Sequence, residues 1–198
     1  LTFERLGSHT HVHTEPQPLP LTPNEYGEQP LAGLRNFAEI NATMSILTRV
    51  PEGYGDVPDT YQRLRTQLPS EENIEAFLTA HQVGVAQLAI EYCNALVEAE
   101  RTNDAAIPPL FVGLNYNAGA NTITPQQWRD WVISPLFERM VGNGQADQPA
   151  RADVEGELEQ LLFDTNLTQC SSDCVERTAT AAKAACAAML GSATMLMQ

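Results

Sequence analysis

The pattern that most constrains the fold is a three- and four-residue spacing of apolar side chains from residue 33 onward. In residues 71–101 this spacing places eight side chains on one helix face: Ile74, Phe77, Leu78, His81, Val85, Leu88, Tyr92 and Leu96. Such a stripe is typical of an amphipathic helix that buries one face against other helices. The sequence therefore predicts an all-α domain over residues 33–198.

Residues that start and stop helices divide this domain into an irregular bundle of about five to six helices. Helices are predicted over residues 33–49, 58–68, 71–101 and 152–164, with another that starts at Thr124 and a last one that runs to the C-terminal residues. Thr124 and Asp173 are predicted N-caps, each with a Gln or Glu three residues later. Pro135 is expected to bend the helix that contains it.

The N-terminal residues have a different character. Residues 1–14 alternate in the manner of a β-strand, but no second strand follows to pair with it. Its sheet is therefore expected in a missing part of a longer chain or in another copy. Residues 15–32 contain five prolines and are predicted to form an extended, semi-rigid linker.

The charge balance argues against two classes of partner. Lys and Arg number 11 and Asp and Glu number 25, so the formal net charge is −14. Nucleic acids and anionic lipid surfaces attract basic proteins, so neither is expected as a partner. No apolar stretch is long enough for a transmembrane segment, which needs roughly 18–20 residues.

Four cysteines permit three complete disulfide pairings. Cys170 and Cys174 flank a polar turn and can close a small loop, whereas Cys93 and Cys186 lie in apolar helical stretches that can meet. The alternative is four reduced thiols, two of them small core residues. The even count and the acidic composition favour at least one disulfide and an exported bacterial protein, at the cell surface, in the periplasm or outside the cell.

Three alternating histidines, His9, His11 and His13, form the candidate metal site. They would lie on one face of the strand, successive members about 7 Å apart, and a zinc or copper ion would need a bend in the strand or a further ligand such as Glu15. The alternative is an exposed strand end that carries histidines.

No other pattern indicates chemistry strongly. His81 lies on an apolar helix face, where it is either a core histidine or an axial haem ligand opposite Met44, Met189 or Met195. The sequence lacks the nucleophile-elbow, P-loop, dinucleotide-binding and zinc-protease motifs. No catalytic residue is predicted, and no bound cofactor is expected beyond a metal ion at the N-terminal histidines.

Several stretches resemble the C-terminal region of bacterial LamG-domain-containing (concanavalin A-like) multidomain surface lipoproteins. The matching stretches are residues 1–15, 34–48, 68–97 and 186–198. The resemblance implies that residues 1–14 are the last strand of an upstream sandwich and that a helical domain of unassigned role follows. It carries over no catalytic residue, and it implies no haem within these residues.

Two functions are compatible with these observations. The first is a non-enzymatic interaction or scaffold module that docks to partner subunits, to its own copies or to the upstream part of its own chain. The second is a metal-binding or electron-transfer accessory subunit that associates with a haem-bearing partner.

Overall fold

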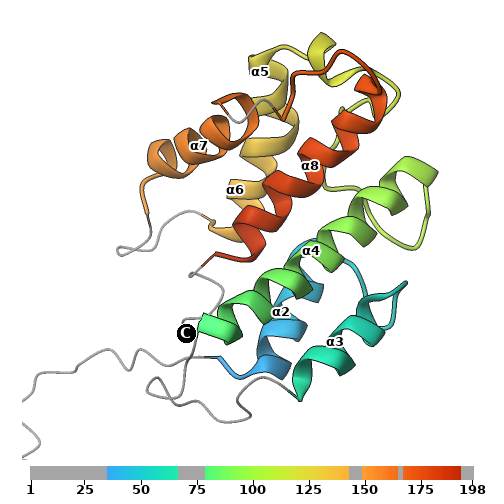
Figure 1. The fold of residues 1–198 in the computed structure, drawn as a ribbon, viewed down its shortest axis with the longest axis vertical. Helices are drawn as coiled ribbons and strands as arrows, with labels where there is room; N and C mark the ends of the chain where they lie inside the picture. Colours follow the sequence, from blue (N-terminus) through green and yellow to red (C-terminus); the bar gives the residue numbers. More distant parts are fainter. Residues whose placement is uncertain (1–34, 67–78, 143–148, 165–166, 193–198) are drawn as a thin grey trace, which may run out of the picture. The chain divides into compact units, whose positions relative to one another are not determined.

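The computed structural model describes residues 35–66, 79–142, 149–164 and 167–192. The chain divides into a unit of Leu1–Leu31 and a unit of Ala32–Gln198, and every described residue belongs to the second unit. The described residues form helices and loops without a strand (Figure 1), which confirms the predicted all-α fold. The predicted strand with its three histidines and the whole predicted linker lie outside the described residues.

The helices follow one another with loops of varied length. In chain order they are α2 (Phe37–Thr48), α3 (Val57–Arg65), α4 (Thr79–Thr102), α5 (Pro125–Trp128), α6 (Ser134–Met140), α7 (Arg151–Glu159) and α8 (Cys174–Leu190). Three shorter turns complete the described part: η3 (Ala120–Thr122), η4 (Arg129–Ile133) and η5 (Gln160–Asp164). The predicted helices are present within a few residues of these bounds. The first part of the predicted 71–101 helix lies outside the described residues.

The start of α5 shows how closely local sequence controls these helices. The Thr124 hydroxyl accepts a hydrogen bond from the Gln127 amide, and the Gln127 side chain accepts one from the Thr124 amide. This reciprocal pair satisfies two donors that the first turn of a helix leaves open, and it confirms the predicted cap. The chain passes through the π-helical turn η4 into α6, and Pro135 lies in the first turn of α6. The bend predicted at Pro135 stays a prediction.

The start of α8 differs from the prediction. Asp173 occupies the N-cap position, but its backbone is left-handed, with φ of 52°, and its side chain makes no cap hydrogen bond. Glu176, predicted to complete the cap, instead forms an ion pair with Arg101 of α4 at 2.7 Å. The prediction of a side-chain cap was therefore wrong, because the Asp173 backbone is not in the extended conformation usual for an N-cap and Glu176 has a tertiary partner.

The core is centred on α4 and α8, which lie side by side in Figure 1. α8 is rich in buried alanines, small residues that allow close approach of neighbouring helices. A disulfide joins Cys93 of α4 to Cys186 of α8, and both residues are fully buried. Just past α8, the Gly191 carbonyl accepts a hydrogen bond from the Gln82 side chain of α4 at 2.9 Å.

A buried polar network fixes α2 against α4. The hydroxyl of Tyr92 donates to the Asn41 side chain at 2.8 Å, and the Asn41 amide donates to Glu52 at 2.7 Å. Burial raises the pKa of the Tyr92 phenol well above its ordinary value, and the Glu52 charge acts in the same direction. Tyr92 is therefore a neutral structural donor in this core.

Candidate functional site

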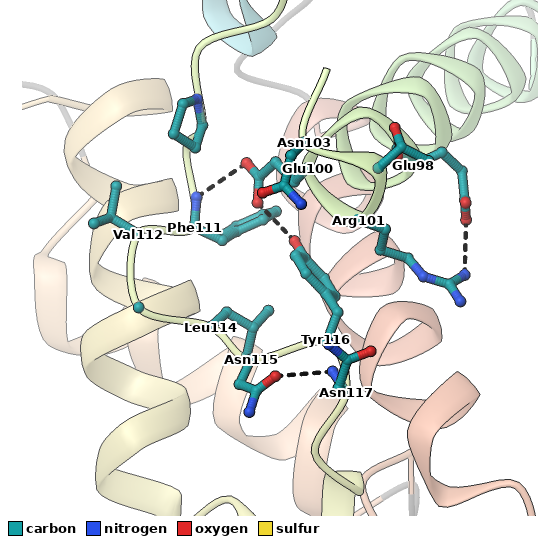
Figure 2. Close-up of a pocket in the computed structure, with 13 residues that line it drawn as sticks. Glu98, Glu100, Arg101, Asn103, Phe111, Val112, Leu114, Asn115, Tyr116 and Asn117 are labelled. Atoms are coloured by element: carbon teal, nitrogen blue, oxygen red, sulfur yellow. Dashed lines mark hydrogen bonds and ion pairs between the residues drawn. The ribbon is translucent and has the colours of Figure 1, made fainter. Parts of the chain in front are cut away.

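A pocket of about 540 Å³ lies between the C-terminal end of α4 and the loop of residues 103–119 that follows it (Figure 2). Its lining combines three groups: charged residues of α4, aromatic and aliphatic residues of the loop, and asparagines. Among the lining residues are Glu98, Glu100, Arg101, Pro109, Val112 and Tyr116.

Glu100 organises the loop from the end of α4. One carboxylate oxygen accepts hydrogen bonds from the amides of Leu110 at 2.6 Å and Phe111 at 3.1 Å. The other oxygen accepts a bond from the Tyr116 hydroxyl at 2.7 Å, as Figure 2 shows. Bonds to an ionised acceptor are the stronger class of hydrogen bond. One side chain therefore satisfies three donors of the loop and sets its path over α4.

Tyr116 has a correspondingly perturbed phenol. Burial raises its pKa far above the ordinary value of 10.0, and the charge of Glu100 and its acceptance of the phenolic hydrogen bond add to that rise. Ionisation would create a second negative charge beside a carboxylate, so the phenol stays protonated. The Tyr116 hydroxyl therefore donates a hydrogen bond and does not act as a base at neutral pH.

The remaining charges of the pocket wall form a second cluster that spans α4 and α8. The Glu98 carboxylate is 2.6 Å from the Lys183 ammonium and 3.2 Å from Arg101, and Arg101 also contacts Glu176. The hydrogen bond from Lys183 lowers the pKa of Glu98, against a smaller opposing effect of burial. Each charge is partly exposed, so these pairs orient side chains more than they stabilise the fold.

Backbone groups of the loop also contact neighbouring helices. The Thr178 hydroxyl of α8 donates to the Ala118 carbonyl at 2.7 Å. Gly113 has a φ of 100°, and a Cβ atom there would lie 2.9 Å from the Trp131 indole nitrogen. Only glycine fits both the backbone conformation and the close contact. The loop that lines the pocket is thus packed against η4 and α8.

An exposed surface lies beside the pocket and shares two residues of its rim. We name it the docking face, and it consists of Ile46, Arg49, Pro109, Val112 and Arg139. Val112 is 72% exposed and Ile46 is 67% exposed. Arg49 donates to the Pro109 carbonyl at 3.1 Å, and Arg139 donates to the carbonyls of Ile46 and Leu47. Within the described residues neither arginine has a carboxylate partner.

The structure describes the predicted cysteines but not the histidines of the predicted metal site. The structure pairs Cys93 with Cys186 and Cys170 with Cys174, with Cα–Cα distances of 5.8 and 5.4 Å. The proposal of four reduced thiols is thereby set aside. The histidine cluster lies outside the described residues, where the metal prediction stays open. Within the described ranges no group of three or more His, Cys, Asp and Glu side chains is placed to hold a metal ion.

Of the four residues named for the haem alternative, the structure describes three. His81 is buried at 7% exposure in α4, and Met44 and Met189 are core residues of α2 and α8. Met195 lies outside the described residues. These positions agree with core roles for His81 and the two methionines, and the haem alternative, which includes Met195, stays a prediction.

Glu100 and the docking face were not predicted from the sequence. Glu100 reads as an ordinary residue at the end of a helix, and its three partners lie 10 to 16 residues later in an aperiodic loop. The arginines of the docking face are 90 residues apart in the chain. No local spacing indicates such a site, because the path of the chain brings its members together.

No protein-family model, curated protein or solved structure matches the chain, so the resemblance to LamG-domain-containing proteins stays a prediction. Among the described helices, none has both the length and the hydrophobicity that crossing a bilayer requires.

Proposed function

We propose that this chain is a non-enzymatic interaction module of an exported or cell-surface bacterial protein, and that it docks through the docking face. One contrast carries the proposal. The charged side chains of the pocket are engaged by groups of the chain itself, whereas Val112 on its rim is 72% exposed. A catalytic site needs ionisable groups directed at a substrate. A docking site needs exposed apolar area with charges around it.

The charges of the docking face support an acidic occupant. Among the residues that the structure describes, Arg49 and Arg139 contact carbonyl oxygens and no carboxylate, so their positive charges can pair with a carboxylate on another surface. Arginine is enriched where protein surfaces meet, because its planar group binds carboxylates with two parallel hydrogen bonds. The chain itself has 25 acidic and 11 basic residues. A second copy of this chain, which is acidic overall, is the occupant that we propose.

The two disulfides support the proposed location. Disulfides form and persist in oxidising compartments, and a domain of this size in the cytosol rarely keeps them. The buried pair joins two core helices, so it is part of the folded structure. Export is thus consistent with the covalent structure of the domain.

The test is the oligomeric state of the purified chain, measured by sedimentation equilibrium at low and high salt. The proposal expects concentration-dependent association that weakens with salt, because the contact is partly electrostatic. Val112→Asp and Arg49→Glu should each weaken it about tenfold or more. Val83→Asp is the matched control, since Val83 is 52% exposed on α4 and lies outside the docking face.

A chain that stays monomeric at every concentration would overturn the second copy as occupant. Equal weakening by Val112→Asp and Val83→Asp would overturn the assignment of the face. Binding of a polyglutamate peptide to a monomeric chain, lost in Arg49→Glu, would assign the face to another acidic protein instead.

A further inference from the structure

The two disulfides lie in contrasting environments. Cys93 and Cys186 are fully buried between α4 and α8. Cys170 and Cys174 are only partly buried, and the three residues between them, Ser171–Asp173, are exposed. A reductant in solution therefore reaches the second disulfide without any opening of the core. Accessibility of this kind separates labile disulfides from structural ones.

The exposed disulfide holds the first turn of α8. Cys174 is the first residue of that helix, and no side chain caps it, since Asp173 has φ of 52° and makes no cap hydrogen bond. A left-handed backbone at a residue other than glycine is costly and persists only where the surroundings impose it. Here the closed loop between the two cysteines is the covalent constraint at that position.

The same turn forms part of the support for the pocket loop. A Cβ atom on Gly119 would lie 3.0 Å from the Cβ of Cys174, so the loop backbone rests directly on this cysteine. One turn further along α8, the Thr178 hydroxyl donates to the Ala118 carbonyl, and Glu176 forms an ion pair with Arg101 of the pocket wall. Two contacts from the loop and one from α4 thus converge on the start of α8.

We propose that the Cys170–Cys174 disulfide is a redox-sensitive latch that holds the start of α8 and, through it, the pocket loop. Its reductant is a small dithiol, or a protein with a vicinal pair of thiols. One thiolate of the reductant attacks the Cys170 sulfur, the disulfide bond breaks, and Cys174 leaves as a thiolate. The leaving thiolate is at the N-terminal end of a 17-residue helix, where the helix dipole stabilises negative charge.

The second thiolate of the reductant then attacks the mixed disulfide and releases Cys170. The reductant becomes a disulfide, and its two electrons and two protons remain on the two cysteine thiols. The freed loop allows Asp173 to leave the left-handed region and the first turn of α8 to fray. The contacts to Ala118 and Gly119 weaken as a result. Any effect on docking rests on the proposed function, whereas the change in the loop does not.

The test uses the folded chain with dithiothreitol, followed by alkylation and mass spectrometry and by amide hydrogen exchange. We expect two alkylated thiols, at Cys170 and Cys174, while Cys93 and Cys186 stay joined. Exchange of the Arg177 amide, which bonds to the Asp173 carbonyl, and of the Thr122 amide should become about tenfold or more faster. Amides in the last turns of α8 should keep their rates.

The Cys170→Ser, Cys174→Ser double variant should show the same fast exchange without a reductant. Simultaneous appearance of four thiols would overturn the latch, as would selective reduction with unchanged exchange at both amides. Sedimentation of the reduced chain is measured separately. Faster exchange in a chain that never associates would retain the latch and refute only the proposed docking.

Discussion

Replacement of Glu100 by glutamine tests whether one carboxylate organises the pocket loop. The change keeps the size and shape of the side chain but removes its charge. The remaining oxygen can still accept from the amides of Leu110 and Phe111. In the wild type, the other carboxylate oxygen accepts a hydrogen bond from the Tyr116 hydroxyl at 2.7 Å. In the variant, an NH2 group that cannot accept this bond takes the place of that oxygen. The bond to Tyr116 must therefore reverse or be lost.

The size of the effect follows from the difference between charged and neutral acceptors. A hydrogen bond to a charged group contributes about 1.5–3 kcal/mol, and a neutral one about 0.5–1.5 kcal/mol. Because the site is partly exposed, we expect Glu100→Gln to lower the free energy of unfolding by about 1–3 kcal/mol. Glu100→Ala leaves three donors unpaired and should cost about 2–4 kcal/mol. In a double-mutant cycle with Tyr116→Phe, the coupling should be about 1 kcal/mol.

The assay is urea unfolding with the disulfides intact, combined with hydrogen exchange at the amides of Leu110 and Phe111. Glu91→Gln is the control, since Glu91 is a partly buried glutamate of the same helix. A Glu100→Gln variant as stable as the Glu91→Gln variant, with unchanged exchange at both loop amides, would refute the role given to Glu100.

Three further predictions follow from other parts of the structure. Replacing Cys93 and Cys186 together by alanine opens a loop that joins residues 93 apart, and calorimetry should show a loss of about 4–5 kcal/mol. Burial raises the pKa of the Tyr116 phenol above its ordinary value of 10.0. The protonated phenol therefore contributes to the stability of the fold below pH 10.0, and this contribution is lost as the pH rises above 10.0. Tyr116→Phe should therefore lose less stability than the wild type in urea titrations above pH 10.0. Gly113→Ala combines a left-handed backbone with a contact to Trp131 and should cost about 1–3 kcal/mol in thermal unfolding.

The helical fold was predictable because each helix carries its own signals. Apolar spacing and local caps act over three or four residues, so they are visible in the sequence. The Thr124 cap is an example, since both members of its hydrogen-bonded pair lie within one turn. The failure at Asp173 has the opposite origin. Its predicted partner Glu176 is held by Arg101, which is 75 residues earlier in the chain.

The candidate site was beyond prediction for the same physical reason. The sequence around Glu100 does not indicate its role, because its three hydrogen-bond partners lie in the loop that follows the helix. The cysteines were the exception among long-range features, because their chemistry allows few pairings. Two apolar helical stretches with one cysteine each already indicated that Cys93 and Cys186 could meet.

The buried disulfide between α4 and α8 has a consequence for proteolysis. Its two cysteines are 93 positions apart, and the pocket loop, η4, α6 and α7 all lie between them. A protease that cuts this segment once, at any point, produces two fragments that remain covalently joined. The nicked protein would keep its mass, apart from one added water, and would run as two bands only after reduction. Exposed loops in this region can therefore be cleaved without separating the helices on either side.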